Sequence, residues 1–292
     1  IGLGSNLIIS ECTFKGCGNI NGVAQVEGSI VYASLSLNEV IFQHNTVESS
    51  TAVLSTGTFN TKVIGNKVTD CGRNTFRFNG GDAETDPYEI IGNYLKGGTN
   101  GCVFNSYAGN RGAHPGTQPR IEDNVFEDIK LAEFDPTDGN YEESLIKDYQ
   151  QQTEYLFILN IAPEYTIKFT NNTFYKVSTI YGGLGIRFNM NDNDIATNKG
   201  VEFAGCHFYN STQTDAGSHG GASRIGAIEG NEDTGKYAPF IFRNCQFHNN
   251  EASEGNGGAI YIDSESEITF ENCHFISNKA NKGGTIYADK AK

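Results

Sequence analysis

The feature that most constrains this chain is a short pattern of apolar residues that returns along its length. It is clearest over residues 268–275, where Ile268 and Phe270 alternate with polar residues, and Cys273 and Phe275 do so again. Alternation with a period of two is typical of β-strands, because successive side chains point to opposite faces. Two residues, rather than one, separate Phe270 from Cys273. The backbone must therefore turn between two short strands.

The position held by Phe275 can be followed backwards as the anchor of a repeated unit. We place it at Phe14, Phe42, Val68, Leu95, Phe126, Phe174, Phe208, Phe247 and Phe275. The spacing is 27 residues from Val68 to Leu95 but 48 residues from Phe126 to Phe174. A unit of this length, extended by loops in places, is typical of solenoid proteins.

The turn in each unit has a characteristic residue type. The residue at the turn is Glu11, Glu39, Gly65, Gly92, Asp123, Asn171, Gly205, Asn244 or Asn272. Most of these are Gly, Asn or Asp, the residues that most readily adopt positive φ. The pattern predicts a one-residue left-handed bend in every unit.

The position after the bend predicts two ladders of identical side chains. Successive units place Asn66, Asn93, Asn124 and Asn172 there, followed by Cys206, Cys245 and Cys273. At a strand spacing of about 4.8 Å, the amides would bond side chain to side chain inside the molecule. We interpret the three cysteines as free buried thiols; a disulfide or a metal site is the alternative. Phe247 and Phe275 would form a further ladder in the core.

Strands that stack on their own equivalents one unit later must run parallel, and the unit is too short for a crossover helix. The sequence therefore predicts an all-β fold, a single-stranded right-handed parallel β-helix of nine to ten coils with loop insertions. We treat residues 1–292 as a single β-helix domain. Because a β-helix exposes strand edges at its ends, we expect it to belong to a longer chain or a fibre.

The insertions are expected at two corners of the coil. One set lies at 82–87, 105–118, 189–199 and 231–238, and the other at 129–154, 211–219 and 251–256. A single short helix is expected within 132–149. The chain has 7 cysteines, so at least one thiol has no partner within it. Cys71 with Cys102 is the one disulfide between coils that the spacing allows.

Charge and hydropathy argue against two classes of partner. The net charge is −14, which disfavours nucleic acid and anionic membranes. No apolar run approaches the roughly 20 residues that span a bilayer, so we expect no membrane insertion by this segment.

Two short motifs give the chain a family resemblance. Gly257-Gly-Ala-Ile260 and the Phe-x-x-Asn motif together resemble the paired repeat of the polymorphic outer membrane proteins. The second motif occurs at Phe42–Asn45, Phe247–Asn250 and Phe275–Asn278. The resemblance is good over 240–287, and the first half matches only the broader pectate-lyase-like β-helix pattern. It implies a secreted or surface-displayed rod, often used in adhesion.

The polysaccharide lyases and hydrolases of the pectate-lyase-like fold are the enzymatic alternative. Glycosidases need an acid and a base that flank the substrate, and the lyases use calcium-binding acids with a basic residue. The paired Asp-Asp, Gly-His-Gly and Arg-x-Lys elements of polygalacturonases are not found. His219, in Gly217-Ser-His-Gly-Gly221, is a partial match to the Gly-His-Gly element, and we interpret it as a loop histidine. We therefore assign no catalytic residue.

Calcium is the one cofactor that the sequence leaves open. Asn189-Met-Asn-Asp-Asn-Asp194 is rich in oxygen ligands but lacks the glycine and distal glutamate of a calcium loop. We interpret it as a solvated turn and assign no metal site. A wider set of acids is expected to form a soluble surface, with a cation or ligand groove as the alternative: Asp82, Glu84, Asp86, Asp192, Asp194, Glu232 and Asp233.

Asn171 and Asn210 each begin an N-glycosylation sequence, which fits an extracellular glycoprotein. Tyr32, Tyr181, Tyr261 and Tyr287 lie in or beside the Gly-Gly strand; buried stacking is expected, and an exposed row could stack sugars.

The sequence favours a non-enzymatic structural or adhesive rod, extracellular or at the cell surface. Its expected partners are a second copy joined end to end, or further coils of the same chain, and glycans. A polysaccharide lyase or glycoside hydrolase is the first alternative, and a non-catalytic carbohydrate-binding module is the second.

Overall fold

The computed structural model describes residues 5–17, 30–33, 37–50, 52–57, 60–71, 75–79, 88–98, 104–107, 120–130, 156–160, 166–179, 184, 186–189, 200–213, 219–225, 239–262 and 267–289. The regular secondary structure of these residues consists of β-strands, so their fold is all-β. The helix expected within 132–149 lies outside the described residues.

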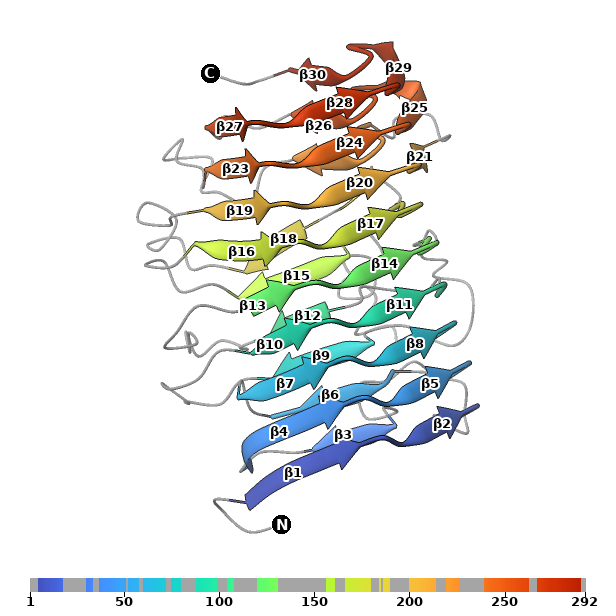
Figure 1. The fold of residues 1–292 in the computed structure, drawn as a ribbon, viewed down its shortest axis with the longest axis vertical. Coiled ribbons are helices and arrows are strands. Elements are labelled where there is room, and N and C mark those ends of the chain that lie inside the picture. Colours follow the sequence, from blue (N-terminus) through green and yellow to red (C-terminus); the bar gives the residue numbers. More distant parts are fainter. Residues whose placement is uncertain are drawn as a thin grey trace, which may run out of the picture.

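Two sheets of nine strands form most of the structure (Figure 1). Sheet 1 contains β1 (Ser5–Ser10), β4 (Leu37–Gln43), β7 (Thr61–Ile64), β10 (Glu89–Ile91), β13 (Arg120–Glu122), β16 (Ile167–Thr170), β19 (Val201–Ala204), β23 (Phe240–Arg243) and β27 (Ile268–Glu271). Sheet 2 contains β2 (Thr13–Lys15), β5 (Thr46–Glu48), β8 (Lys67–Thr69), β11 (Tyr94–Lys96), β14 (Val125–Glu127), β17 (Thr173–Tyr175), β20 (His207–Tyr209), β24 (Gln246–His248) and β28 (His274–Ile276).

Three smaller sheets lie on the other side of the core. Sheet 3 contains β3 (Val31–Ala33), β6 (Leu54–Thr56), β9 (Phe76–Asn79), β12 (Phe104–Tyr107), β15 (Phe157–Asn160) and β18 (Ile186–Asn189). One three-stranded sheet contains β21 (Thr212–Gln213), β25 (Glu251–Asn256) and β29 (Lys279–Lys282). The other contains β22 (Ser223–Ile225), β26 (Ile260–Ile262) and β30 (Ile286–Ala288).

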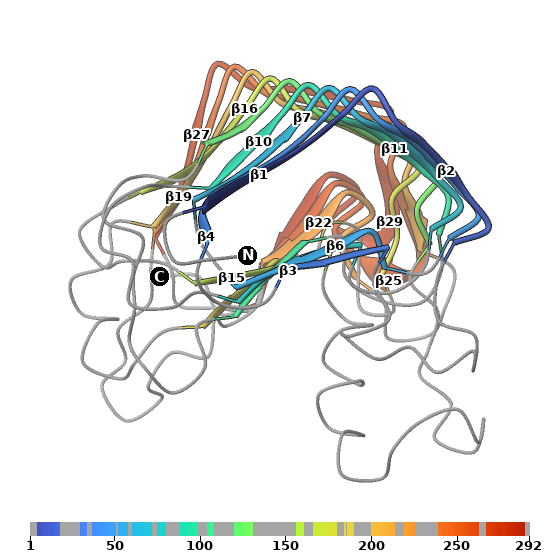
Figure 2. The ribbon, with the colours of Figure 1, turned by 90° about the horizontal axis from the view of Figure 1, so that it is seen from below.

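Neighbouring strands within each sheet come from consecutive repeats and pair in parallel. This holds in sheet 1, in sheet 2 and in the smaller sheets. We call one strand of sheet 1, with everything up to the next strand of sheet 1, a rung; rung 1 begins with β1 and rung 9 with β27. Figure 2 looks along the stack and shows the strands of each sheet lying over one another. These stacked parallel sheets are compatible with a parallel β-helix.

Each rung contains two left-handed bends that are five residues apart. The first bend is at Glu11, His44, Gly65, Gly92, Asp123, Asn171, Gly205, Asn244 and Asn272, and the second at Gly16, Ser49, Asp70, Gly97, Asp128, Lys176, Asn210, Asn249 and Ser277. Their φ angles lie between 48° and 68°. The predicted bend is confirmed in every rung except rung 2. The second bend, which encloses the three-residue strand of sheet 2, was not predicted.

In rung 2 the predicted register was wrong. Val47, rather than Phe42, pairs with Phe14 and Val68 and is the anchor. Phe42 belongs to β4, where it pairs with Ile9 and Val63. The bend is accordingly at His44 rather than Glu39. The error arose because β4 is seven residues long and carries its own buried Val and Phe two residues apart.

The core consists of aromatic columns that run along the stack. Phe126, Phe174, Phe208, Phe247 and Phe275 stack with centroid separations of 4.7 to 5.1 Å. A second column, Phe169, Phe203, Phe242 and Phe270, stacks at 4.8 to 5.2 Å. The two columns meet edge to face, for example Phe203 with Phe208 at 5.8 Å. Full burial of each such side chain stabilises the fold by about 1.5 to 3 kcal/mol.

The Gly-Gly motif has a steric explanation. The first glycine has positive φ at Gly220, Gly257 and Gly283, and the second lies against main chain of the following rung at Gly221 and Gly258. A Cβ on Gly258 would lie 2.1 Å from the carbonyl oxygen of Gly284, and one on Gly221 would lie 2.2 Å from that of Gly258. Only glycine permits this approach of neighbouring rungs.

Candidate functional site

The position after the first bend carries a ladder of buried amides. Asn45, Asn66, Asn93, Asn124 and Asn172 are at most 1% exposed. Each Nδ2 up to Asn124 donates to Oδ1 of the asparagine in the next rung at 2.9 to 3.1 Å. Each Nδ2 in the ladder also donates to a main-chain carbonyl of the preceding rung at 2.8 to 3.1 Å.

The amide oxygens complete the ladder. Oδ1 of Asn66, Asn93, Asn124 and Asn172 each accepts a second bond, from the main-chain N–H of the previous asparagine, at 2.9 to 3.0 Å. A buried amide is costly unless its donors and acceptor are bonded. Here every rung satisfies the polar groups of the next, so the ladder fixes the rung-to-rung register. The turn predicted at Glu39 would put Val40 in this position in rung 2, whereas the bend at His44 puts Asn45 there.

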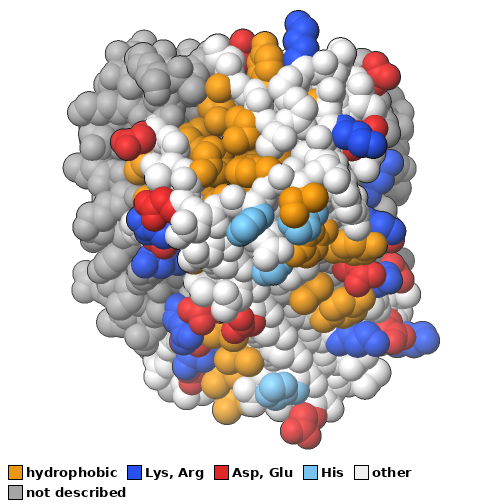
Figure 3. Space-filling model, turned by 45° about the horizontal axis from the view of Figure 1, so that its top comes forward, with side chains coloured by type: hydrophobic (Ala, Val, Ile, Leu, Met, Phe, Trp, Pro, Cys, Tyr) orange, Lys and Arg blue, Asp and Glu red, His pale blue; other side chains and the backbone are white. Residues whose placement is uncertain are grey.

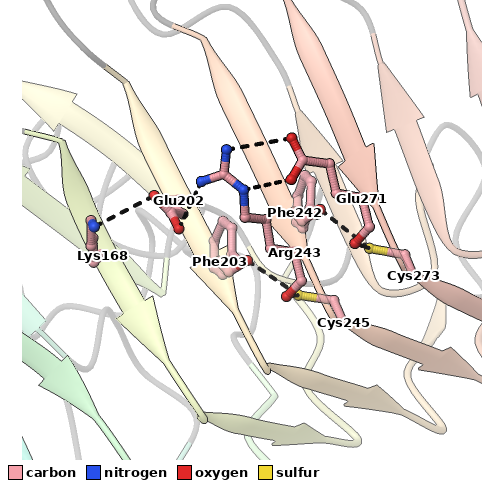
Figure 4. A network of polar contacts seen from close by, with 8 residues as sticks. All are labelled: Lys168, Glu202, Phe203, Phe242, Arg243, Cys245, Glu271 and Cys273. Carbon is pink, nitrogen blue, oxygen red and sulfur yellow. Dashed lines mark hydrogen bonds and ion pairs between the residues drawn. The ribbon is translucent and has the colours of Figure 1, made fainter.

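The thiols continue the same row and keep its hydrogen bond to a main-chain carbonyl of the preceding rung. Sγ of Cys206, Cys245 and Cys273 donates to the carbonyls of Phe169, Phe203 and Phe242 at 3.2 to 3.3 Å. Figure 4 shows two of these bonds. All three cysteines are free. The pKa of Cys245 is raised, first by its hydrogen bond with Cys206 and then by burial, and burial raises that of Cys273. Protonated, buried thiols are poor nucleophiles.

A second ladder follows the second bend and includes Asn250 and Asn278 of the Phe-x-x-Asn motif, whereas Asn45 of the remaining occurrence belongs to the first ladder. Nδ2 of Asn250 donates to Oδ1 of Asn278 at 3.0 Å, and the main-chain N–H of Ser211 donates to Oδ1 of Asn250 at 3.1 Å. Cys17 and Cys71 occupy the same row as free thiols in rungs 1 and 3. Ser50 lies between them and accepts from the N–H of Cys17. Cys102, the partner considered for Cys71, lies outside the described residues.

The outer face of sheet 1 carries charges that are paired across the rungs. Glu202 contacts Lys168 at 3.7 Å and Arg243 at 3.1 Å, and Arg243 contacts Glu271 at 2.7 Å (Figure 4). The bond from Arg243 lowers the pKa of Glu271. Exposed pairs of this kind contribute little to stability, because solvent screens them. These acids and bases neutralise one another, which suits a structural surface.

His219 lies in an aromatic column. Its ring stacks on Tyr261 at 4.3 Å, and Tyr261 stacks on Tyr287 at 5.6 Å. Its Nδ1 accepts the main-chain N–H of Asn256 at 3.0 Å. Tyr32 is 51% exposed, and Tyr181 lies outside the described residues.

The predicted glycosylation residues both lie at bends. Asn171 is exposed at a first bend, and Asn210 is partly exposed at a second bend. The acids at 82–86, 192–194 and 232–233 lie outside the described residues, as does the oxygen-rich segment beyond Asn189. Within the part of the chain that the structure describes, no group of three or more His, Cys, Asp or Glu could hold a metal ion. The same residues contain no helix able to cross a membrane.

The C-terminal rung leaves the core columns partly open. Phe242, Cys245 and Phe247 of rung 8 are at most 1% exposed, whereas their equivalents Phe270, Cys273 and Phe275 are only partly buried. Hydrophobic side chains gather near the top of Figure 3, where this rung lies. Rung 1 is similar, since Leu7, Ile9 and Phe14 are also only partly buried. These two surfaces, which we call the end faces, are the main candidate for a binding function.

Comparisons of the chain with protein-family models, with curated proteins and with solved structures find no match. The likeness to the polymorphic outer membrane protein repeat therefore rests on the motifs, whose glycines and asparagines have the structural roles described above.

Proposed function

We propose that the chain is a single-stranded right-handed parallel β-helix, related to the polymorphic outer membrane protein repeat. It serves as a structural or adhesive rod outside the cell or on its surface. The observation that carries the proposal is the partial exposure of the core columns at Phe270 and Phe275. A rod whose internal ladders reach its last described rung can be extended without any change in its pattern, either by a second copy or by further rungs of the same chain.

The occupant of that end face is a second copy, joined head to tail. Rung 1 repeats the inward pattern of rung 9: Leu7, Ile9, Cys12 and Phe14 are the equivalents of Ile268, Phe270, Cys273 and Phe275. Placed one strand spacing beyond rung 9, these side chains would continue both core columns and the thiol ladder. The contact joins two different faces, so it repeats into an open fibre.

The charges at the two end faces are compatible with this contact. Glu271 would meet Ser10, and Asn272 would meet Glu11, so the described bend positions bring no like charges together. The thiol of Cys12 donates to Ser10 within its own rung at 3.3 Å. In a stack it gains the carbonyl of Phe270, which is the acceptor that its equivalents have in rungs 7 to 9.

The surface location is supported by Asn171 and Asn210, which lie at bends where an attached glycan would point away from the core. Mass spectrometry of native material tests this part of the proposal. Occupied sites support an extracellular glycoprotein, and unmodified peptides from both sites count against it.

Sedimentation velocity over a concentration series tests the head-to-tail contact. Wild type should form larger species as concentration rises, and Phe275→Lys should remain a monomer because it places a charge in the core column of the end face. Thr269→Lys, on the outer row of the same rung, is the matched control and should associate like wild type. A wild-type chain that stays monomeric would refute the contact.

Assays on polygalacturonate, alginate and chondroitin, with and without Ca²⁺, test the enzymatic alternative. We expect no cleavage by the wild-type chain. Depolymerisation of any of the three would replace the structural rod with a polysaccharide-degrading enzyme.

A further inference from the structure

The outer face of sheet 2 changes from charged to uncharged side chains halfway along the stack. In the N-terminal half it carries ion pairs, including Lys15 with Glu48 at 3.3 Å and Lys96 with Glu127 at 2.7 Å. From β17 to β28 the two outward rows contain no Asp, Glu, Lys or Arg. They consist of Thr173, Tyr175, His207, Tyr209, Gln246, His248, His274 and Ile276. We call these eight residues the His–Tyr face.

A neutral face is unusual in a chain with a net charge of −14. Depletion of charge together with enrichment in aromatic side chains distinguishes the centre of a protein–protein interface from the rest of a protein surface. Exposed tyrosine rings also suit other ligands that are apolar on one side and polar at the rim. Histidines lie beside hydrophobic side chains on this side of the molecule in Figure 3. The described His–Tyr face therefore has the composition of a binding site.

Its polar groups are held in place by one another. Tyr209 donates its hydroxyl to Oε1 of Gln246 at 2.8 Å, and the same hydroxyl oxygen is hydrogen-bonded to Nδ1 of His207. Because the single phenolic proton goes to Gln246, Nδ1 of His207 carries the proton and donates it. This tautomer leaves Nε2 of neutral His207 as an acceptor. The Tyr209 ring packs between His207 at 5.4 Å and His248 at 5.2 Å.

One group on the face lacks a partner. Nε2 of His248 is buried and has no hydrogen bond among the described residues. An unsatisfied buried polar atom is rare in folded proteins and calls for an explanation. Because this nitrogen has almost no accessible surface, a sugar hydroxyl could bond to it only after the imidazole ring has rotated.

We propose that the His–Tyr face binds an uncharged, extended polysaccharide that runs along the stack across β17, β20, β24 and β28. Sugar rings pack against the tyrosine and histidine rings, and their hydroxyls bond to the imidazole and amide groups. The strands repeat at about 4.8 Å, so the polysaccharide contacts a further pair of outward side chains at every rung. Aromatic side chains suit a ligand that is apolar on one side and polar at its rim.

The alternative occupant, a protein, is less favoured by the composition. Ile276, 50% exposed, is the single aliphatic side chain among the eight, whereas the centre of a protein interface is more apolar. Burial and the nearby His248 lower the pKa of His207, which keeps its imidazole neutral near pH 7. Lys176, at the bend after β17, lies over the Tyr175 ring at 5.2 Å, so the face is flanked by a positive charge at that end. The eight side chains themselves give no electrostatic preference for an acidic polysaccharide.

The proposal adds a ligand to the adhesive role and does not depend on end-to-end stacking. It is tested by retention on cellulose, xylan and laminarin, which are neutral, and on polygalacturonate and alginate, which are acidic. The Phe275→Lys variant, which is expected to be monomeric, is assayed beside wild type. If it binds like wild type, the His–Tyr face acts alone, whatever the outcome of the stacking experiment.

Two variants and a matched control locate the site. Tyr209→Leu keeps the bulk but removes the ring and the hydroxyl, and should reduce retention at least tenfold. His274→Ala, at an exposed position, should weaken it less and leaves the fold intact even if Tyr209→Leu does not. Tyr94→Leu changes a partly buried tyrosine in the charged half of the same sheet and should have no effect.

Three results would overturn the proposal. They are no retention of wild type on any neutral polysaccharide, retention on the acidic polymers alone, and equal loss in Tyr94→Leu and in the His–Tyr face variants. Capture of a purified protein ligand by the face, competed by none of the neutral polysaccharides, would assign it to a protein instead.

Discussion

Nδ2 of Asn66 donates to Oδ1 of Asn93 in the next rung at 2.9 Å, and both side chains are buried. The same oxygen accepts the main-chain N–H of Asn66 at 2.9 Å. One amide thus satisfies two buried donors of its neighbour, and the relationship recurs rung after rung. It couples the rungs by side-chain as well as main-chain hydrogen bonds.

Replacing one member should destabilise the fold well beyond the loss of one contact. Asn93→Ala leaves both donors of Asn66 and the carbonyl of Val63 without their partner. At about 1 to 3 kcal/mol for each unsatisfied buried group, we expect a loss of at least about 3 kcal/mol in the free energy of unfolding. Urea denaturation measures it. Lys67→Ala, at an exposed position in rung 3, is the control and should change stability by less than about 0.5 kcal/mol.

The glycine motif predicts a steric effect. Gly258→Ala places a Cβ 2.1 Å from the carbonyl of Gly284, so the last two rungs must separate locally. We expect a loss of about 1 to 3 kcal/mol, measured by thermal and chemical unfolding. Gly92→Asn is the control, because a Cβ at this bend meets nothing within 4 Å and Asn tolerates its positive φ. Equal losses in the two variants would show that the Gly-Gly contact is not the cause.

Thiol reactivity should follow burial. Burial raises the pKa of Cys71 to about 11, and Cys206 and Cys245 are also buried, whereas Cys12 is exposed. Because the thiolate is the reactive form, iodoacetamide at pH 8 should modify Cys12 first and leave Cys71, Cys206 and Cys245 intact until the chain unfolds. Peptide mass spectrometry over time reads this directly. Early modification of Cys245, or its recovery as a disulfide, would contradict the thiol ladder.

The histidine pair predicts an acid-sensitive step. In register, His207 lies between Thr173 of β17 and Gln246 of β24. Its ring contacts Tyr209 of its own strand, and His248 of β24 is the nearby titratable group. Burial, followed by the charge of His248, lowers its pKa below the ordinary value of 6.5. The unfolded chain therefore binds more protons, so this contribution to stability is complete above about pH 6.5 and is lost as pH falls through the lower native pKa.

Unfolding free energies measured at intervals from pH 7.5 to pH 5 test this effect. His207→Gln should lose less stability on acidification than wild type. His44→Gln, at an exposed bend, is the control and should follow the wild-type curve. The interpretation is wrong if His207→Gln and wild type lose the same unfolding free energy between pH 7.5 and pH 5.

Much of the fold follows from local sequence rules. Alternation, followed by a Gly, Asn or Asp bend, identifies the strands around Phe126, Phe174, Phe208, Phe247 and Phe275, whose bends take the residue types that positive φ favours. The second bend escaped prediction because its residues include Lys176, Ser49 and Ser277, which carry no positive-φ signature. The register predicted for rung 2 was wrong because Val40 and Phe42 of β4 have the same two-residue spacing as the residue after the bend and the anchor in other rungs.

The candidate sites were harder to predict. The ladder asparagines stand out by their repetition, whereas the His–Tyr face consists of residues that look ordinary one at a time. The signal that could have found it is the loss of charge on the residues flanking the anchors Phe174, Phe208, Phe247 and Phe275. That signal becomes visible only when the strands are aligned in register.

The axial repeat of the assembled protein tests the central claim most directly. Nine rungs at about 4.8 Å should give one copy about every 43 Å along a fibre, with the strands perpendicular to its axis. Electron cryomicroscopy of concentrated protein measures both spacings. Fibres with this repeat, absent in Phe275→Lys, are the expected result. Particles that remain single, or that join side by side without this repeat, would contradict the head-to-tail rod.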